Sequence, residues 1–372
     1  MLTFKDLEKQ YDDFRVPQYE ILVGSPETAV GSLTALAAEE FPVLSVNVSQ
    51  SVGSASSAQI SFACPYDYEK SRFESDVYAK FEAGSKIAVK LGYSKPEIVF
   101  IGAIGTINTS FSASGVTLSV TCYDAKMALF HNKTWKSFTK QSTIQTVVEE
   151  LLEPCKKYGD VIVSGLKYDE LVSKGQERNW VQDNIDDYRF VMRLAALTNS
   201  SFYTTGETTH FVENIMDTAQ AAVKLGWGSG LINFSIDIDI SGQVGSVEVA
   251  YRTGEREVGY ATYEGKDIKG DGKLPSDKGG IVSSKSIELT ETLVDNEEQA
   301  LIAAKNIYLE KAMAYVTGQA STIGLPDIRA GEAVQLEGLG EKLNGKYFLS
   351  KVEHKFDAGG YLTSFTCQRA KI

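Results

Sequence analysis

The sequence has few of the side chains that usually carry out catalysis or bind metals. Its 372 residues include only three histidines and four cysteines, and no two cysteines stand in a CxxC pattern. A disulfide framework or a zinc site is therefore not expected, and folding in a reducing cytoplasm is the simplest interpretation. Cys122 and Cys367 lie within predicted strands, where a cysteine is most simply a small buried apolar side chain.

The sequence also lacks an excess of positive charge and a long apolar run. The formal net charge is -12, which argues against nucleic-acid binding and against adsorption to anionic membranes. No run approaches the roughly 20 apolar residues that are needed to cross a bilayer. The first residues are charged and aromatic, so we do not expect a secretory signal.

No pattern of titratable residues in the sequence indicates an active site. His131, His210 and His354 lie in three different segments, and none has a carboxylate at the spacing of a metal ligand. His354 lies within a predicted strand, so we interpret it as a structural residue rather than a base. A glycosidase needs two carboxyl groups about 5–9 Å apart across a cleft, and closeness in the sequence does not establish such a pair.

The aspartates that stand close together have structural explanations. Asp186 and Asp187 precede a predicted helix, where they are expected to cap it and to interact with its dipole. Asp237 and Asp239 alternate with isoleucines, as residues on the exposed face of a strand do. The sequence therefore predicts a protein that is not an enzyme and that has no cofactor and no metal site.

Glycine and aromatic residues, in contrast, are abundant. The chain has 32 Gly, 18 Tyr and 17 Phe, a composition that favours β-structure with many turns. In residues 318–372, apolar and polar side chains alternate between glycine-bearing turns. This period of two indicates antiparallel strands that pack on one face.

The same passage occurs twice in the chain. Residues 112–126, SASGVTLSVTCYDAK, align with residues 357–371, DAGGYLTSFTCQRAK. The identical pairs are Ala113 and Ala358, Gly115 and Gly360, Ser119 and Ser364, Thr121 and Thr366, Cys122 and Cys367, Ala125 and Ala370, and Lys126 and Lys371. Residues 81–84 likewise align with 328–331, and 44–48 with 232–236. Because several elements recur in the same order, we predict an internal duplication of a β-domain.

The sequence divides into four predicted parts. They are an N-terminal arm at 1–16, a first β-barrel domain at 17–128, an α+β insertion domain at 129–228 and a second β-barrel domain at 229–372, with a polar excursion at 253–290 that we expect to be a long exposed loop. Helices are predicted at about 68–81, 141–157, 186–199 and 295–316, the last with Asp295 and Glu298 at capping-box spacing. The fold class is thus mainly β with an α+β insertion.

Two stretches resemble the phage late control gene D family, which comprises baseplate hub proteins of contractile tails and the hub part of type VI secretion spike proteins. The carboxy-terminal matches are Gly324, Pro326, Ala330, Gly331, Val334, Gly338, Gly345, Tyr347, Val352, His354, Gly360, Tyr361, Thr363 and Phe365. The second match, NIDDYRFVMRLA at 184–195, includes Asp187, Tyr188, Phe190, Arg193, Leu194 and Ala195 and resembles a helix of the family. It departs from the family pattern at Ile185, Asp186, Tyr188 and Arg189, which places the chain nearer to phage-like or extracellular injection systems than to type VI systems.

This resemblance implies a structural baseplate hub rather than an enzyme. Hubs of this family are homotrimers in which two homologous β-barrels per chain form a pseudo-six-fold ring, so that a trimeric spike is joined to a hexameric inner tube. The implied partners are the spike protein, the inner tube or a tube-initiator protein, and baseplate wedge components. The implied location is the baseplate of a phage tail, tailocin or injection particle, assembled in the bacterial cytoplasm. We further expect the acidic balance to keep the channel from binding nucleic acid or cargo in transit.

Two other classes of function stay open at the level of the sequence. A hydrolase that acts on cell-wall glycan requires a pair of acidic residues in one cleft. A carbohydrate- or receptor-binding tail module requires exposed aromatic side chains along a groove. Trp135, Trp180 and Trp227 are the residues to examine for the second alternative.

Overall fold

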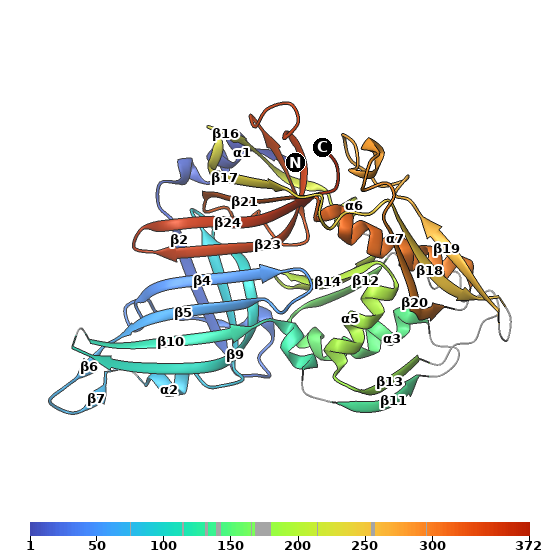
Figure 1. Ribbon diagram of the computed structural model, residues 1–372. Coiled ribbons are helices and arrows are strands. Elements are labelled where there is room, and N and C mark those ends of the chain that lie inside the picture. The colour runs from blue at the N-terminus through green and yellow to red at the C-terminus, as the bar shows by residue number, and fades with distance from the viewer. Residues whose placement is uncertain are drawn as a thin grey trace.

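The computed structural model describes residues 1–74, 76–113, 115–130, 133–138, 143–164, 166–167, 180–213, 215–253, 257–294 and 296–372, the side chains of 291–293 excepted. Strands dominate these residues, and most of them belong to one sheet (Figure 1). This confirms the predicted fold class, mainly β with an α+β insertion. None of the described helices is long and apolar enough to cross a membrane.

The main sheet has fourteen strands and contains both copies of the predicted repeat. Its order is β1-β16-β17-β21-β24-β23-β4-β5-β10-β9-β8-β2-β3, and β22 pairs with β16 and β23. The strands are β1 (Leu2–Thr3), β2 (Gln18–Gly24), β3 (Thr34–Ala35), β4 (Val43–Ser51), β5 (Ser57–Cys64), β8 (Lys86–Gly92), β9 (Glu97–Ser112), β10 (Gly115–Tyr123), β16 (Ala221–Trp227), β17 (Gly230–Ile238), β21 (Val316–Ile323), β22 (Ala333–Glu337), β23 (Gly345–Asp357) and β24 (Gly360–Arg369).

The second copy closes into a six-stranded barrel. Its strands pair in the cycle β16-β17-β21-β24-β23-β22 and back to β16. The first copy has the equivalent order β4-β5-β10-β9-β8-β2. No ladder joins β2 to β4 among the described residues, and a groove of about 440 Å³ lies between these strands.

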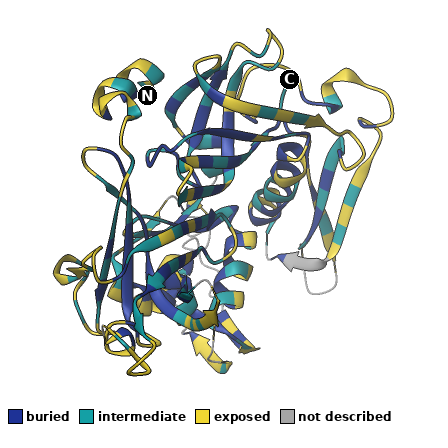
Figure 2. Ribbon diagram, turned by 90° about the vertical axis from the view of Figure 1, so that its left-hand side faces the viewer, coloured by how far each residue is buried: buried dark blue, intermediate teal, exposed yellow. Residues whose placement is uncertain are grey.

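The two copies are joined edge to edge. Strand β4 of the first copy pairs antiparallel with β23 of the second, over residues 45–51 and 351–357. As a result β17, β21, β24, β23, β4, β5 and β10 run side by side across both copies (Figure 1). One hydrophobic core is continuous beneath this sheet, and buried positions gather inside both copies (Figure 2).

The internal repeat extends to the hydrogen-bond register. A β-bulge between Val43 and Ser45 has its counterpart between Leu231 and Asn233, at an offset of 188 residues. A second pair of bulges adjoins Cys122 and Cys367, where β10 pairs with β9 and β24 with β23. These equivalent irregularities are what a duplicated domain retains, because bulges are specific features of a strand pair.

The insertion forms a separate layer with its own core. It contains the two-stranded sheet β11 (Thr134–Phe138) and β13 (Trp180–Ile185), the three-stranded sheet β12 (Asp160–Ser164), β15 (Thr208–Glu213) and β14 (Ser200–Thr205), and the helices α3 (Ile144–Leu151), α5 (Asp187–Leu197) and α6 (Ile215–Thr218). Thr143 and Asp186 cap α3 and α5 by accepting backbone N–H bonds. The helix predicted at 141–157 is shorter than expected, because Pro154 begins a separate 3-10 turn at Glu153–Tyr158.

A third unit corrects the prediction for the second half. The expected loop at 253–290 is in part β19 (Val258–Tyr263) and β20 (Ser286–Val294), which pair with β18 (Ser246–Arg252) outside the barrel. Helix α7 (Glu297–Met313) packs on this sheet, with Ala300 and Ala304 in one core with Val247 and Val249. The capping residue is Asn296, whose side chain accepts the N–H of Gln299. Asp295, the predicted cap, lies outside the described residues.

The helix predicted at 68–81 is also mostly wrong. Only α2 (Val77–Lys80) is helical, and β6 (Tyr66–Asp67) and β7 (Arg72–Phe73) form a small hairpin. The side chain of Asp67 accepts the N–H groups of Glu69 and Lys70 and so stabilises a turn in place of a helix. The N-terminal arm forms α1 (Phe4–Gln10), whose Leu7 is buried in the main core.

Candidate functional site

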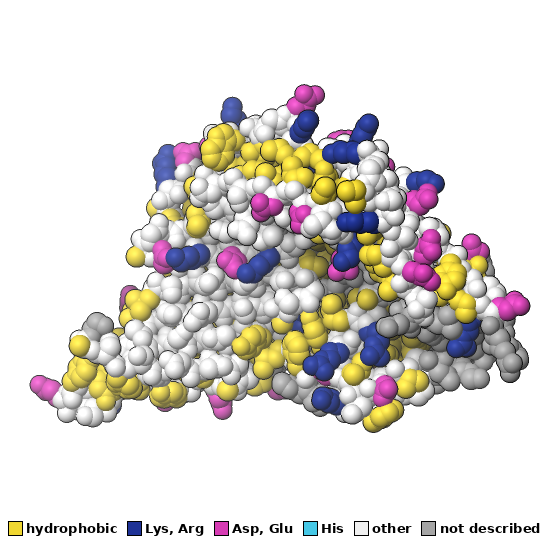
Figure 3. All heavy atoms as spheres, in the orientation of Figure 1, with side chains coloured by type: hydrophobic (Ala, Val, Ile, Leu, Met, Phe, Trp, Pro, Cys, Tyr) yellow, Lys and Arg dark blue, Asp and Glu magenta, His cyan; other side chains and the backbone are white. Residues whose placement is uncertain are grey.

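A broad polar face extends over both copies of the repeat. It lies on one side of β17, β21, β24, β23, β4, β5, β10 and the second half of β9. The ladder registers place small polar side chains on it, which we call the polar face: Asn233, Ser235, Gln319, Ser321, Ser364, Thr366, Ser45, Asn47, Ser49, Gln59, Ser61, Thr117, Ser119, Thr121, Thr106 and Asn108. Figure 3 shows a wide area over these strands with few hydrophobic or charged side chains.

Most charges on the polar face lie on β23, where they are paired, and Asp237 of β17 adds a further exposed carboxylate. Lys351 lies 2.5 Å from Glu353, and Lys355 lies 2.9 Å from Asp357. The equivalent positions on β9 are uncharged threonine, asparagine and serine residues. The face is therefore hydrated and carries no unpaired lysine or arginine among these residues, so it offers little that binds a polyanion tightly.

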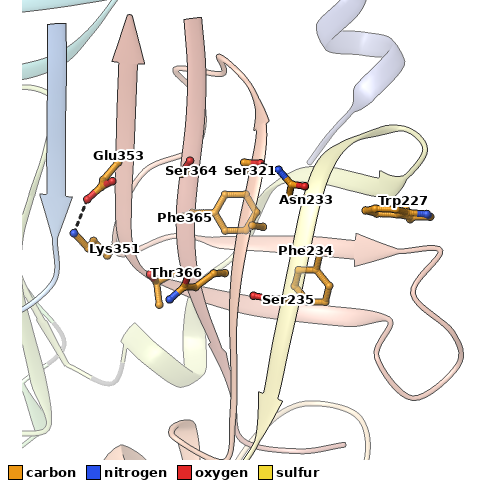
Figure 4. Close-up of a pocket in the computed structure, with 12 residues that line it drawn as sticks. Trp227, Asn233, Phe234, Ser235, Ser321, Lys351, Glu353, Ser364, Phe365 and Thr366 are labelled. Carbon is orange, nitrogen blue, oxygen red and sulfur yellow. Dashed lines mark hydrogen bonds and ion pairs between the residues drawn. The ribbon is translucent and has the colours of Figure 1, made fainter.

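A cavity of about 640 Å³ opens at the β17 end of the polar face (Figure 4). Its labelled lining includes Trp227 and Phe234 at one side and the Lys351–Glu353 ion pair at the other. Of the tryptophans that the sequence singled out, Trp227 is 58% exposed at this cavity, Trp135 is exposed elsewhere, and Trp180 is buried in the insertion. One exposed tryptophan beside a shallow cavity does not form an aromatic groove.

Ala330 and Gly331 join the two copies and the insertion. The backbone N–H of Ala330 donates to Oε1 of the buried Gln50, and Nε2 of Gln50 donates to the carbonyl of Val99. Gly331 has a φ of 88°, and a Cβ built on it meets the ring of Tyr203 at 2.3 Å. These two motif residues therefore fix how the second copy meets its neighbours.

His354 and Tyr361 form a buried polar cluster. The Nδ1 atom of His354 lies 2.9 Å from the hydroxyl of Tyr361 and 3.2 Å from that of Thr363. His354 is fully buried, and burial lowers its pKa to about 3. Its Nε2 has no hydrogen-bond partner within the described part of the chain. The imidazole is thus neutral, away from solvent and in a structural setting.

Tyr347, Gly345 and Gly360 occupy the same barrel. The buried Tyr347 donates its hydroxyl to the carbonyl of Leu343, and the guanidinium of Arg369 lies 5.5 Å from its ring centre. Gly345 has a φ of 147° and leaves room for that guanidinium, since a Cβ there meets Arg369 at 2.7 Å. Gly360 turns the chain from β23 into β24 with a φ of 111°. All three positions therefore shape the barrel.

The motif residues of α5 hold the insertion together. Asp187 accepts a hydrogen bond from Gln182, while Phe190, Leu194 and Ala195 are buried in the core of the insertion. Tyr188 stacks on Phe130 with ring centres 4.5 Å apart, and its hydroxyl donates to the carbonyl of Gly53 in the first copy. The structure thus places the twelve predicted motif residues in two groups, one in the second barrel and one in the insertion. Neither group gathers into a catalytic constellation.

Sequence reasoning missed a buried ion pair at the joint between the first copy and the insertion. Nζ of Lys126 lies 3.9 Å from Oδ2 of Asp124, and both side chains are almost fully buried. The carboxylate accepts the hydroxyl of Thr204 at 2.5 Å and the N–H of Ser56 at 2.9 Å. The repeat matched Lys126 with Lys371, but nothing in the pattern indicates which of the two lysines is buried.

The other candidate residues also have structural surroundings. His210 stacks on Tyr203, and burial lowers its pKa to about 4. Asp186 caps α5, as predicted, by accepting the N–H of Arg189 at 2.7 Å. No group of three or more His, Cys, Asp or Glu side chains that could hold a metal ion occurs among the residues that the structure describes. His131 lies outside those residues.

The buried His354 predicts a sensitivity to acid. The unfolded chain takes up a proton near pH 6.5, whereas the folded His354 does so only near pH 3. Stability that is present above pH 6.5 is therefore lost as the pH falls, by up to about 1.4 kcal/mol per pH unit. His354→Gln keeps a hydrogen-bond acceptor but does not titrate. Between pH 6.5 and 4.5 we expect the free energy of unfolding to fall by about 2 kcal/mol more in the native protein than in this variant.

Urea unfolding at a series of pH values measures this difference. Glu332 acts in the opposite direction, because burial raises the pKa of its carboxyl to about 7. Its contribution is present below pH 4.5 and is lost as the pH rises through 7. Because the native protein and the His354→Gln variant both contain Glu332, the difference between their pH profiles of unfolding free energy reports His354 alone. Parallel pH profiles for the two chains would contradict the assignment.

Comparison with known proteins identifies a family and a fold. The model of the family described as the Alg8 N-terminal domain matches residues 29–358. No curated protein matches the sequence significantly. The resemblance to the late control gene D family in particular stays a prediction.

Solved structures with this fold include several tail proteins. The tail protein from Neisseria meningitidis MC58 has a TM-score of 0.63 at 13% identity, covering 95% of this chain and 96% of its own. The 43 kDa tail protein of prophage MuSo2 from Shewanella oneidensis has a TM-score of 0.64 at 14% identity, covering 95% and 99%. An Escherichia coli component of the type VI secretion system, described as structurally similar to T4 bacteriophage tail proteins, has a TM-score of 0.55 at 11% identity, covering 88% and 73%.

Proposed function

The chain belongs to the family described as the Alg8 N-terminal domain, and from the fold that it shares with tail proteins we infer that it is a structural baseplate hub of a contractile injection machine. In this role it joins a hexameric inner tube to a trimeric spike and performs no catalysis. The proposal covers a phage tail, a tailocin and an extracellular injection system alike. It places the chain in the baseplate after assembly in the bacterial cytoplasm.

The observation that carries this proposal is that the chain contains two copies of one β-domain, joined so that the polar face continues across both. Two equivalent copies per chain mean that three chains supply six equivalent copies around a ring. A ring of this kind presents three-fold symmetry to a spike and approximate six-fold symmetry to a tube, which resolves the mismatch between them. The proposed partners are a second and a third copy of this chain, the spike, the inner tube or a tube initiator, and wedge components.

The polar face is proposed to line the central channel of this ring. Its serine, threonine, asparagine and glutamine side chains keep a layer of water, and its lysines are paired with carboxylates. A hydrated wall whose lysines are paired has no basic patch that retains nucleic acid. Most of the net negative charge of the chain lies on other surfaces.

The four units predicted from the sequence are retained as a proposal for the domain boundaries. In this scheme 17–128 and 229–372 build the ring together with β16 at the end of the 129–228 segment, which closes the second barrel, and the rest of the insertion lies beside the ring. The unit formed by β18, β19, β20 and α7 packs against the second copy through Ala333 and Phe348. We propose that this unit and the insertion provide surfaces for the wedge components.

Mass in solution is the test of the hub. Light scattering over a range of protein concentrations is expected to give three times the 40.6 kDa mass of one chain. Negative-stain images of that species are expected to show a ring with a central channel and six similar lobes. A chain that stays monomeric at every concentration, or a closed dimer, would contradict the proposal. Binding of glycan fragments that quenches Trp227 fluorescence would instead favour a carbohydrate-binding tail module.

A further inference from the structure

We propose that strand β17 of one chain pairs with the second half of β9 of the next chain, antiparallel and in a defined register. The inference rests on the proposed function and adds the residues of the interface. Its occupant is a second copy of this chain, because both complementary edges belong to the same polypeptide. Such a head-to-tail interface closes into a ring when the rotation between copies is right.

The first step is that the chain already contains one example of this junction. Strand β23 of the second copy pairs with β4 of the first copy, residues 351–357 opposite 45–51. The equivalents of these two segments by the repeat are 106–112 of β9 and 233–239 in and after β17. The equivalence follows from matching bulges and from matching ladder pairs such as Ile107 with Val120 and Val352 with Phe365.

The second step is that these equivalent edges have no ladder partner among the described residues. Residues 106–111 have ladder pairs only with β10, since β8 pairs with the first half of β9, up to Ala103. Residues 233–238 pair only with β21, since β16 meets β17 at Gly230 and Leu231 alone. Each of these edges, 106–111 and 233–238, is six residues long and has no proline, and a long unprotected edge of that kind is a template for strand addition.

The third step compares burial at the two kinds of edge. Gln50 of β4 is 1% exposed where it faces β23, whereas its equivalent Ile238 is 50% exposed. Phe111 on the other free edge is 60% exposed, and Phe356, its equivalent at the inner junction, is half-buried against Tyr19. Apolar side chains are thus exposed at both free edges, whereas the equivalent side chains at the inner junction are buried or half-buried. Burial of this area on association is favourable.

The register follows by transfer from the inner junction. Asp357 opposes Ser45 there, Lys355 opposes Asn47, and Lys351 opposes Ser51. Subtracting 245 from the first residue and adding 188 to the second gives the pairs between chains: Thr106 with Asp239, Ile107 with Ile238, Asn108 with Asp237, Thr109 with Ile236, Ser110 with Ser235, Phe111 with Phe234, and Ser112 with Asn233. Beneath the sheet Ile107 meets Ile238 and Phe111 meets Phe234, with Thr109 opposite Ile236 between them, and polar side chains meet on the polar face. No like charges oppose each other.

A disulfide cross-link tests the register. Ser110 and Ser235 are exposed on the polar face of the single chain, so S110C and S235C should leave the fold intact. Directly opposite residues bring their Cβ atoms to about 5 Å, close enough for a disulfide after small adjustments, whereas diagonal neighbours lie about 7–8 Å apart. The four native cysteines are buried and do not compete. We expect oxidised S110C/S235C protein to run as a covalent trimer on a non-reducing gel.

The matched control is S110C/D237C, which shifts one cysteine by two residues on the same face. It is expected to cross-link at least about tenfold more slowly. Equal rates for the two variants would overturn the register. A trimer by light scattering that gives no cross-link with S110C/S235C would overturn this interface and leave the hub standing. A monomer that gives no cross-link would contradict both.

A charge at the free edge provides an independent readout. I238K places a lysine opposite Ile107 on the apolar side of the proposed contact and is expected to weaken trimer formation at least about tenfold, because its charge has no partner there. I281K is the control, since Ile281 is 76% exposed and belongs to neither edge. Both variants should keep the circular dichroism of the native monomer. An unchanged trimer with I238K would contradict the proposed contact.

Discussion

Gly331→Ala is expected to cost about 3 kcal/mol or more of the free energy of unfolding, although it adds a single methyl group. Gly331 has a φ of 88°, where an L side chain is strained, and its Cβ would lie 2.3 Å from the ring of Tyr203. That ring belongs to β14 of the insertion and is buried, so it cannot move aside freely. Strain in the backbone and overpacking therefore act together.

The repeat supplies a matched control for this variant. Gly84, its equivalent in the first copy, has the same φ of 88°, but no atom lies within 4 Å of a Cβ built there. Gly84→Ala is expected to cost only about 1 kcal/mol, from the backbone conformation alone. Urea unfolding of the two variants gives both costs. Similar losses for Gly84→Ala and Gly331→Ala would show that the contact with Tyr203 contributes little.

Much of the sheet could be predicted from the sequence because its signals are local. Alternating side chains and glycine turns, such as Gly115 and Gly360, define the hairpins of both copies, and these turns have equivalent places in the ladders. Cys122 and Cys367 align in the repeat, and both side chains are fully buried, each in its own copy. Thr143 and Asp186 mark helix starts for a similar reason, since a cap depends only on the three residues that follow it.

What the sequence could not reveal is which strands become neighbours over long distances. A period of two assigns each side chain to a face, but it does not say that β4 pairs with β23 or that β18 leaves the barrel. Polar composition also misled at 264–285, where Ile268 and Leu274 are buried under glycine- and lysine-rich loops. In the stretch at 66–73 an aspartate that binds the backbone favoured a turn over the predicted helix.

The candidate site shows the same division between local and distant information. Outward serines and threonines on β4, β5 and β10 appear in the sequence as ordinary solvent-facing positions. Only the registers align them with Ser364 and Thr366 of the second copy into one face. The motif residues lie on α5 and in the second barrel, and their contacts, such as Tyr188 with Gly53, join segments 135 residues apart. Nothing in the sequence specifies those partners.

Asp124→Ala is expected to destabilise the protein by about 3–5 kcal/mol, because it leaves the buried ammonium of Lys126 without its counter-charge. The variant also removes the acceptor for Thr204 and Ser56. Lys126→Met should cost less, about 1–3 kcal/mol, since the carboxylate keeps three hydrogen-bond donors, the hydroxyl of Thr204 and the N–H groups of Ser56 and residue 126. Burial lowers the pKa of Lys126, opposed by Asp124. Urea unfolding at pH 7 measures the loss in each variant.

The double variant Asp124→Ala with Lys126→Met decides whether the pair acts as a unit. Its cost should fall below the sum of the single costs by about 1–3 kcal/mol, since neither charge is then left alone. Lys371→Met is the control from the second copy, where the lysine is only half-buried and donates to the carbonyl of Ile268. Additive costs would mean that the two charges are independent. Coupling would show that Asp124 and Lys126 act as one buried unit. Thr204 and Phe202 of β14 contact this unit, so it also stabilises the packing of the insertion on the first copy. Tyr203 of the same strand packs against Gly331 in the second copy.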